Sequence, residues 1–166
     1  ILPLNAVIMA GGRGKRLRPL TDNTPKPLLK IGRKTIIEHV IDQIKAYGIM
    51  DYHISVGYMA EKIEHHLGDG KKKNINIRYI KEDKPLGTAG ALSKLRNLER
   101  DILLTNSDLF TNIDYEDLYL TFIKHKADIA VESITYNFKI PYAILYGNNN
   151  KVDSFKEKTS NTYYEN

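Results

Sequence analysis

Glycines and cations are concentrated near the start of this chain, directly after the apolar residues Ala6–Met9. Gly11, Gly12 and Gly14 occupy three of four consecutive positions. Because glycine has no Cβ and accepts positive φ, successive backbone N–H groups of such a loop can converge on an anion. The cations of the loop are Arg13, Lys15, Arg16, Arg18, Lys26 and Lys30. Phosphate is therefore the predicted ligand, and so many cations suit the triphosphate of a nucleotide.

Two common phosphate-binding signatures are absent from this loop. The dinucleotide pattern G-x-G-x-x-G would need a third glycine where Leu17 stands, and no Gly-Lys-Ser/Thr sequence completes a P-loop. The prolines from Pro19 to Pro27 exclude a long helix, so the stretch is predicted to keep one irregular path. On glycines and charges alone, the alternative is an ordinary glycine turn beside a solvated basic loop.

A carboxylate follows a second apolar run. Asp108 comes shortly after Ile102–Thr105, where a strand is expected. Ligands of open α/β sheets bind at the carboxyl ends of strands, and a hard oxygen ligand suits Mg²⁺. We therefore expect Asp108 to bind Mg²⁺. The alternative is an aspartate that caps the following turn.

The segment Glu82–Ala91 combines Pro85 with Gly87 and Gly90. Glycines at such a junction allow a helix N-terminus to approach a ligand closely, and partial positive charge gathers at that end of a helix. The segment therefore indicates a second region of ligand contact. The alternative is an ordinary junction between a loop and a helix.

Short apolar strands and amphipathic helices alternate along the chain and must position these residues. A capping box of Thr35 and Glu38 begins the first helix, which ends at Gly48. The expected strands are 6–9, 52–56, 75–80, 102–104 and 127–134, followed by a hairpin of 142–145 and 152–155 around the turn 147–150. The other expected helices are a short one containing Ile63 and Leu67, then 87–98 and 114–126. This order predicts an α/β, Rossmann-like fold with a mostly parallel sheet and helices on both faces.

Composition narrows the class of protein. The 166 residues, 42% of them hydrophobic, suffice for one domain with a substantial core. Without a long apolar run or the features of a secretory signal, neither membrane nor export is expected, and the lack of cysteine favours a cytoplasmic protein. The net charge of +5 is spread over a loop, the Lys71–Lys73 run and several helix faces, which argues against nucleic acid as a partner. The five histidines lack the spacing of a metal site.

The string GGRGKRLRPLT, followed by PKPLL, resembles the signature of the sugar-phosphate nucleotidyltransferases, which make nucleoside-diphosphate sugars from an NTP and a sugar 1-phosphate. Four later strings resemble further motifs of that family in the same order: EDKPLGTAGA, NSD, PYA and FKEK. The resemblance implies the nucleotide-diphospho-sugar transferase fold, with residues 1–166 as one nucleotidyltransferase domain lacking its C-terminal part. It also implies Mg²⁺ as cofactor, a homodimer and, in the branch that the N-terminal string most resembles, a CBS-domain pair upstream.

The same resemblance assigns roles to individual residues. The implied catalytic residues are Arg16 on the departing pyrophosphate, Lys26 on the α-phosphate, Lys158 on the sugar phosphate and Asp108 on the metal. The implied nucleotide-binding residues are Ala10, Gly11, Gly12, Gly14, Lys15, Glu82, Gly87 and Thr88. The implied sugar-binding residues are Asn106, Ala143 and Glu157.

These roles imply nucleotidyl transfer, in which an NTP and a sugar 1-phosphate give an NDP-sugar and pyrophosphate. By its position in the resembled motif, Glu82 faces the Watson–Crick edge of the base. A carboxylate accepts from two donors at once, which guanine supplies with N1–H and its N2 amino group, so GTP is favoured. Uracil and thymine offer one N–H beside acceptors. The alternatives are the same reaction with UTP, CTP or dTTP, and a catalytically incomplete module that binds nucleotide or sugar phosphate.

Overall fold

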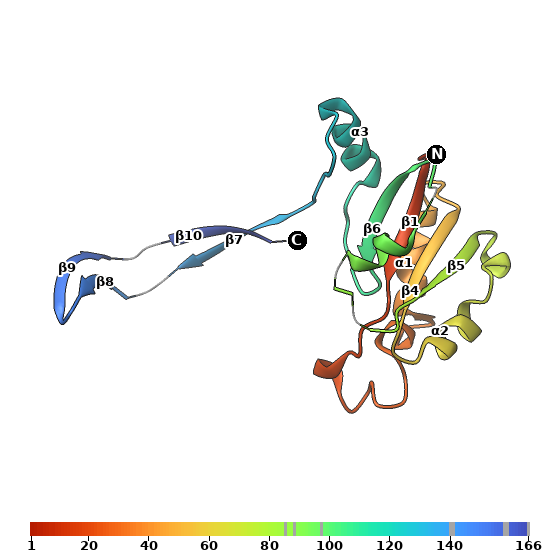
Figure 1. The fold of residues 1–166 in the computed structure, drawn as a ribbon, viewed down its shortest axis with the longest axis horizontal. Coiled ribbons are helices and arrows are strands. Elements are labelled where there is room, and N and C mark those ends of the chain that lie inside the picture. Colours follow the sequence, from red (N-terminus) through yellow and green to blue (C-terminus); the bar gives the residue numbers. More distant parts are fainter. Residues whose placement is uncertain (85, 88, 97, 140–141, 158–159, 166) are drawn as a thin grey trace. The chain divides into compact units, whose positions relative to one another are not determined.

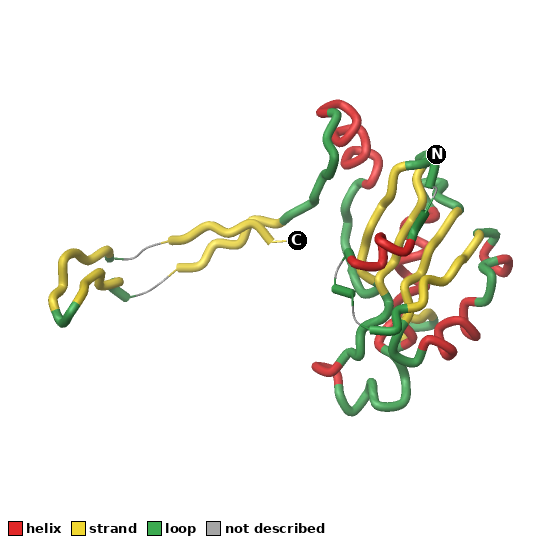
Figure 2. The backbone as a smooth tube through the Cα atoms, in the orientation of Figure 1, coloured by secondary structure: helices red, strands yellow, loops and turns green. Residues whose placement is uncertain are grey.

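The computed structural model describes residues 1–84, 86–87, 89–96, 98–139, 142–157 and 160–165. The chain divides into two compact units, Ile1–Asp117 and Leu118–Asn166. Figure 1 labels the main helices and strands of each unit, and Figure 2 marks the loops that connect them. Among the described residues, every helix lacks the combination of length and apolar character that crossing a membrane requires.

A four-stranded parallel sheet forms the centre of the first unit, in the order β5-β4-β1-β6 (Figure 1). Its strands are β1 (Leu4–Met9), β4 (Asp51–Val56), β5 (Asn76–Lys81) and β6 (Asp101–Asn106). The chain steps from β1 through β4 to β5 and then crosses to β6 on the other side of β1. The predicted parallel sheet is confirmed, and its strand order switches direction at β1. In such sheets ligands bind beyond the carboxyl ends of the strands at the switch.

The helix α1 (Ile36–Lys45) packs on one face of this sheet. The predicted capping box is confirmed, because the Thr35 N–H donates to Glu38 Oε2 at 2.8 Å and the Thr35 side chain faces the Glu38 backbone N–H. The Thr35 hydroxyl also donates to Glu38 Oε2 at 2.9 Å. The Tyr52 hydroxyl of β4 donates to the Ile41 carbonyl of α1 at 3.4 Å, which places α1 on the Tyr52 side of the sheet. The buried residues of α1 recur at helical spacing and are Ile36, Ile37, Val40, Ile41 and Ile44.

A short 3₁₀ helix, η4 (Gly90–Lys94), packs on the opposite face of the sheet. Its Ala91 packs in one buried cluster with Val7 of β1 and Ile80 of β5. Val7 follows Ala6, the register partner of Tyr52, so Val7 points away from α1. Helical segments therefore lie on both faces of the sheet, as predicted.

The predicted helix over 87–98 is wrong in extent, since among the described residues of this stretch only the five of η4 are helical. Gly87 has a φ of 79°, which a right-handed helix cannot contain, and Leu95 is extended with a ψ of 130°. The two positions confine the helix from both sides. The burial of Ala91 holds the remaining turn against the sheet.

Short elements complete the first unit. The predicted helix around Ile63 and Leu67 is confirmed, and both side chains are buried. The basic loop keeps the predicted irregular path and contains only single turns of 3₁₀ helix. The remaining elements are η1 (Lys15–Leu17), η2 (Lys26–Leu28), β2 (Lys30–Ile31), β3 (Lys34–Thr35), α2 (Ala60–Leu67) and η3 (Lys71–Lys73).

The second unit is built from antiparallel strand pairs that follow α3 (Tyr115–His125), the predicted helix at 114–126, which begins in the first unit. The predicted hairpin is confirmed, and its turn residues Asn149 and Asn150 have positive φ of 48° and 65°, as a two-residue hairpin turn requires. The strand pairs are β7 (Ile134–Lys139) with β10 (Ser160–Glu165) and β8 (Ile144–Asn148) with β9 (Lys151–Lys156).

The predicted strand over 127–134 is wrong, because residues 127–133 form no strand and β7 begins at Ile134. Ile134 is paired with Glu165, the last residue of β10. A strand needs a neighbouring backbone to satisfy its N–H and C=O groups. The apolar residues before Ile134 therefore lie beyond the ladder.

Candidate active site

The glycine loop leaves β1 at the carboxyl edge of the sheet and is held by two backbone hydrogen bonds. The Ala10 N–H donates to the Ser55 carbonyl at 2.8 Å, and the Tyr58 N–H donates to the Gly11 carbonyl at 3.2 Å. Gly12 is exposed, and no atom lies within 4 Å of the place that a Cβ would take. The loop thus offers open main chain at the strand-order switch, which close approach of a phosphate requires.

Gly14 turns the chain into the basic loop with a φ of 59°. A Cβ at this position would lie 3.0 Å from Thr21 Cγ2 and 3.1 Å from Lys26 Cβ. Thr21 is buried, and its hydroxyl donates to the Gly14 carbonyl at 2.9 Å. The missing side chain of Gly14 therefore allows Lys26 to pack against the glycine loop. Thr21 was not a predicted site residue, although it ends the string GGRGKRLRPLT.

The arginines and lysines of the basic loop differ in their surroundings. The Arg13 guanidinium lies 5.6 Å from the centre of the Tyr58 ring, and Arg18 Nε lies 3.3 Å from Asp22 Oδ1. Lys15 and Arg16 are exposed on η1, directly after Gly14. Arg13 and Arg18 thus contact protein groups, whereas Lys15 and Arg16 present their charges on the surface.

Lys26 and Asp108, two of the predicted catalytic residues, form an ion pair although 82 positions separate them. Lys26 Nζ donates to Asp108 Oδ2, and the two side chains are 34% and 33% exposed. The structure therefore brings together the lysine expected at the α-phosphate and the carboxylate expected at the metal. Both groups remain open to a ligand.

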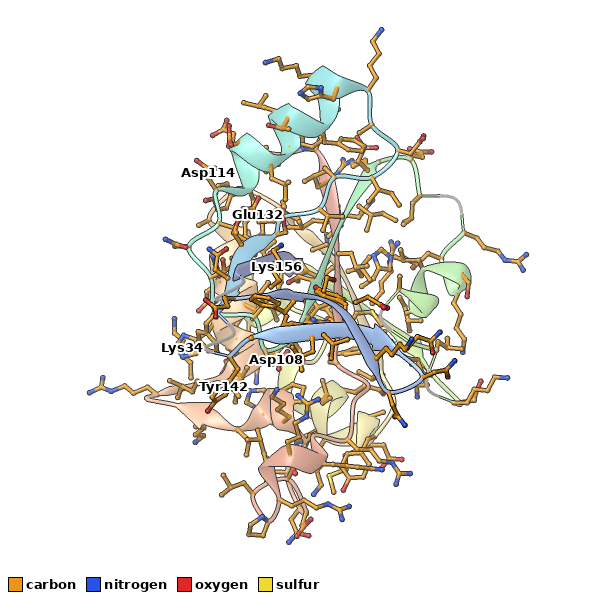
Figure 3. The ribbon with its side chains drawn as sticks, turned by 90° about the vertical axis from the view of Figure 1, so that its left-hand side faces the viewer. Lys34, Asp108, Asp114, Glu132, Tyr142 and Lys156 are labelled. Carbon is orange, nitrogen blue, oxygen red and sulfur yellow. The ribbon has the colours of Figure 1, made fainter. Side chains whose placement is uncertain are left out.

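Local structure explains how each partner of this pair is placed. Lys26 begins η2 between Pro25 and Pro27, which are both buried. Asp108, labelled in Figure 3, follows β6 after Ser107, whose backbone N–H donates to the Met9 carbonyl at 3.0 Å. That hydrogen bond extends the contact of β6 with β1 by one residue. Asp108 is therefore held at the carboxyl edge of the sheet.

Asp108 is the carboxylate predicted to bind a metal at this edge. Among the described residues, no group of three or more His, Cys, Asp and Glu side chains could hold a metal ion. Mg²⁺ in nucleotide sites is bound through one or two carboxylates, with substrate phosphates and water as its other ligands. A partly exposed Asp108 next to an open glycine loop fits that mode of binding.

Glu82 follows β5 and lies beside the glycine loop. Its Oε1 accepts a hydrogen bond from the Ser55 hydroxyl, and its Oε2 accepts one from the Leu86 N–H at 3.2 Å. A Cβ at Gly11 would lie 3.1 Å from Oε1. Ser55 was missed by sequence reasoning, and its only signal is a small polar residue within a buried strand.

The remaining predicted residues of the first unit lie at a strand end and in a loop. Asn106 is the exposed last residue of β6, and Gly87 is exposed in the loop before η4. Thr88 falls outside the described residues.

In the second unit, two predicted sugar-binding residues are neighbours. Ala143 precedes Ile144, and Glu157 follows Lys156, which is labelled in Figure 3. Ile144 and Lys156 are register partners, so Ala143 and Glu157 lie at the same end of the β8–β9 hairpin. Lys158 falls outside the described residues.

A family model described as nucleotidyl transferase matches residues 5–164. The chain belongs to the nucleotidyl transferase family. Residues 10–26 place open main chain and exposed cations at one edge of the sheet, an arrangement that suits phosphate. The resemblance drawn from the motifs is thereby confirmed.

Relatives of this nucleotidyl transferase chain act on sugar 1-phosphates. It is 31% identical over 157 residues to the D-glycero-alpha-D-manno-heptose 1-phosphate guanylyltransferase of Aneurinibacillus thermoaerophilus, covering 93% of this chain and 68% of that protein. It is 35% identical over 167 residues to the mannose-1-phosphate guanyltransferase of Schizosaccharomyces pombe, covering 93% and 45%. It is 37% identical over 123 residues to the N-acetylmuramate alpha-1-phosphate uridylyltransferase of Neisseria meningitidis, covering 71% and 52%. The chain thus spans between about half and two thirds of these relatives.

A solved structure has the same fold. HddC from Yersinia pseudotuberculosis, complexed with GMP-PN, superposes with a TM-score of 0.62 at 24% identity, covering 98% of this chain and 73% of that one. The expected α/β fold of the nucleotide-diphospho-sugar transferases is confirmed.

Proposed function

We propose that this chain transfers a nucleotidyl group from an NTP, with GTP favoured, to a sugar 1-phosphate and releases pyrophosphate. The observation that carries the proposal is the Lys26–Asp108 pair beside Gly14, which joins the cation proposed for the α-phosphate and the carboxylate proposed for the metal at the strand-order switch. Family membership and relatives that act on sugar 1-phosphates support it.

The triphosphate lies along the glycine loop in this proposal. Backbone N–H groups from Ala10 to Gly14 and the exposed Lys15 contact its phosphates, as such loops do with anions. Arg16 stabilises the departing pyrophosphate, because a planar guanidinium can bridge two phosphate oxygens. Lys26 leaves Asp108 and contacts the α-phosphate.

The reaction forms one bond and breaks one. A sugar 1-phosphate oxygen attacks the α-phosphorus, the bond from that phosphorus to the bridging oxygen of the β-phosphate breaks, and pyrophosphate departs with the electron pair. Because the attacking oxygen is already ionised, no general base is needed. Positioning of the two substrates and neutralisation of their charge therefore supply most of the rate.

Asp108 is the residue that would hold Mg²⁺, which when bound would offset the negative charge that develops on the phosphates. Asn106, at the end of the same strand, is assigned to the sugar. Ala143 and Glu157 are assigned to sugar hydroxyls, and Lys158 to the sugar phosphate. Gly87 and Thr88 are assigned to the nucleotide.

Guanine is the favoured base because Glu82 offers a carboxylate beside the glycine loop. Two relatives are guanylyltransferases by name, which supports GTP. A third relative is a uridylyltransferase by name, which makes UTP the second candidate.

The test is pyrophosphate release in the presence of Mg²⁺, with GTP, UTP, CTP and dTTP each offered a panel of hexose, heptose and N-acetylhexosamine 1-phosphates. Release with GTP supports the whole proposal. Release with UTP alone supports nucleotidyl transfer but rejects guanine as the preferred base. Nucleotide binding without release from any pair rejects the reaction and leaves a binding module.

A further inference from the structure

Ser55 connects the glycine loop to Glu82 through its main chain and its side chain. It is the fifth residue of β4, and 0% of its surface is exposed. Its carbonyl oxygen accepts the Ala10 N–H at 2.8 Å, and its hydroxyl donates to Glu82 Oε1. One buried residue therefore fixes both the start of the glycine loop and the carboxylate beside it.

The Glu82 carboxylate is held at both oxygens. Besides the Ser55 hydroxyl on Oε1, the Leu86 N–H donates to Oε2 at 3.2 Å. The Glu82 N–H donates to the Val56 carbonyl at 2.9 Å, which fixes the backbone at the base of the side chain. Since each carboxylate oxygen has two acceptor positions, one stays available on each oxygen. Glu82 thus presents a fixed pair of hydrogen-bond acceptors.

Gly11 limits the carboxylate on another side. A Cβ at Gly11 would be 3.1 Å from Glu82 Oε1 and 3.3 Å from its carboxyl carbon, so the carboxylate lies directly against the main chain of the loop. Ser55 is completely buried, so water cannot replace Glu82 as the partner of its hydroxyl. The orientation of Oε1 is therefore determined by Ser55 and Gly11 together.

We propose that Ser55 is a specificity-determining positioning residue that sets the base preference of the site by orienting Glu82. The inference rests on the proposed function, in which Glu82 contacts the base. Guanine offers two adjacent N–H donors to the fixed pair of acceptors. Uracil offers one N–H flanked by carbonyl oxygens, which a fixed carboxylate repels. If the Glu82 carboxylate is free to rotate, it binds the two donors of guanine less well and can turn away from the carbonyl oxygens of uracil. Both effects reduce the preference for GTP over UTP.

The test measures the affinity of the protein for GTP and for UTP by isothermal titration calorimetry, with kcat/KM for each from pyrophosphate release. We expect the preference for GTP over UTP to fall about tenfold in Ser55→Ala, the scale of one lost hydrogen bond to a charged group. Ser55→Thr keeps the hydroxyl and should retain the preference. Thr105→Val is the matched control, because Thr105 is a buried hydroxyl near the end of β6 that bonds to the Asn106 carbonyl.

A double variant separates positioning from a general structural effect. Because Ser55 acts through the carboxylate, Ser55→Ala should leave the GTP:UTP ratio unchanged once Glu82 is replaced by glutamine. An equal loss of affinity for both nucleotides in Ser55→Ala would overturn the proposal, as would an undiminished effect in the Glu82→Gln background. If Ser55→Ala does not fold, Ser55→Cys replaces it, since a thiol is a weak donor.

The binding measurement also separates this proposal from the reaction itself. A protein that prefers GTP without releasing pyrophosphate contradicts the reaction, and a preference that falls in Ser55→Ala still supports the role of Ser55. A wild-type protein that does not prefer GTP overturns the role of Ser55, whichever nucleotide it turns over.

Discussion

Lys26 donates to Asp108 and so ties η2 to the turn that follows β6. Both side chains are about one-third exposed, and ion pairs in such surroundings add little to the stability of a fold. The pair matters instead for the state of the proposed site before substrate binds, because the Lys26 ammonium and the Asp108 carboxylate neutralise each other. In the proposed reaction a nucleotide phosphate takes the lysine and a cation takes the aspartate.

Replacement of Lys26 should therefore affect the rate more than the fold. We expect Lys26→Ala to lower kcat about 10²-fold or more, the scale observed when one group that stabilises a transition state is removed. The measurement is pyrophosphate release at saturating NTP. Lys72→Ala, at an exposed lysine of η3, is the control and should keep the wild-type rate. A Lys26→Ala protein with near-normal turnover would remove Lys26 from the mechanism.

Two glycines of the loop should respond differently to an added methyl group. Gly14→Ala forces a positive φ on alanine and crowds Thr21 and Lys26, so the free energy of unfolding should fall by about 1–2 kcal/mol or more. Gly12→Ala points into open space and should change stability by less than about 0.5 kcal/mol. Urea unfolding of the two variants checks the difference. Equal losses of stability in the two variants would show that neither the positive φ of Gly14 nor its close contacts require glycine at this position.

His53 should make stability depend on pH. It is buried in β4, its Nδ1 has no hydrogen-bond partner within the described part of the chain, and burial together with the charge of Arg78 lowers the pKa of His53 below 6.5. Between the folded and unfolded pKa values the unfolded chain binds more protons, so the free energy of unfolding falls as the pH drops below about 6.5. Urea unfolding from pH 8 to pH 5 measures this loss.

The variant His53→Gln should remove that slope, whereas His125→Gln, at an exposed histidine of α3, should keep it. If the loss of stability near pH 6 persists in His53→Gln, another group causes it.

A separate loss of stability at lower pH is expected from Glu38. Although burial opposes the shift, hydrogen bonds from Thr35 and the charge of Lys73 lower the pKa of Glu38 below 4.5. Its contribution is complete above pH 4.5 and is lost as the pH falls through the folded pKa.

The contribution of the capping box at α1 to stability can be measured with substitutions of Thr35. Thr35→Ala removes the hydroxyl that donates to Glu38 and should lower the free energy of unfolding by about 1 kcal/mol, the usual cost of losing an N-cap side chain. Thr35→Ser keeps the hydroxyl and should retain most of the stability. Guanidinium unfolding compares the three proteins. A Thr35→Ala protein of wild-type stability would mean that the backbone N–H bond to Glu38 suffices.

Much of the fold could be predicted because its signals are local. The apolar runs of β1 and β4, the capping box at Thr35 and the paired asparagines of the hairpin turn each depend on residues a few positions apart. The helix at 87–98 failed because helical periodicity says nothing of the positive φ at Gly87. The strand at 127–134 failed because a strand exists only where a partner strand reaches it.

The candidate site was predictable to a similar degree. The glycine loop and Asp108 each follow an apolar strand, so their common place at the carboxyl edge follows from a parallel sheet. Their contact through Lys26 depends on the path of an irregular loop, which no periodicity encodes. The Ser55–Glu82 hydrogen bond depends on the order of β4 and β5 in the sheet, so the sequence around Ser55 carries no sign of it.

The strand order also implies that the two strands leading to the candidate site differ in how easily they unfold locally. β1 has a hydrogen-bonded neighbour on each side, whereas β6 is at the edge of the described sheet and pairs with β1. Backbone amides of an edge strand exchange with solvent deuterium sooner than those of an inner strand, because fraying the edge disturbs one ladder only. The end of β6 that precedes Asp108 should therefore fray more often than the end of β1 that precedes the glycine loop, and in the proposed site the loop expected to bind the nucleotide starts from the more stable strand.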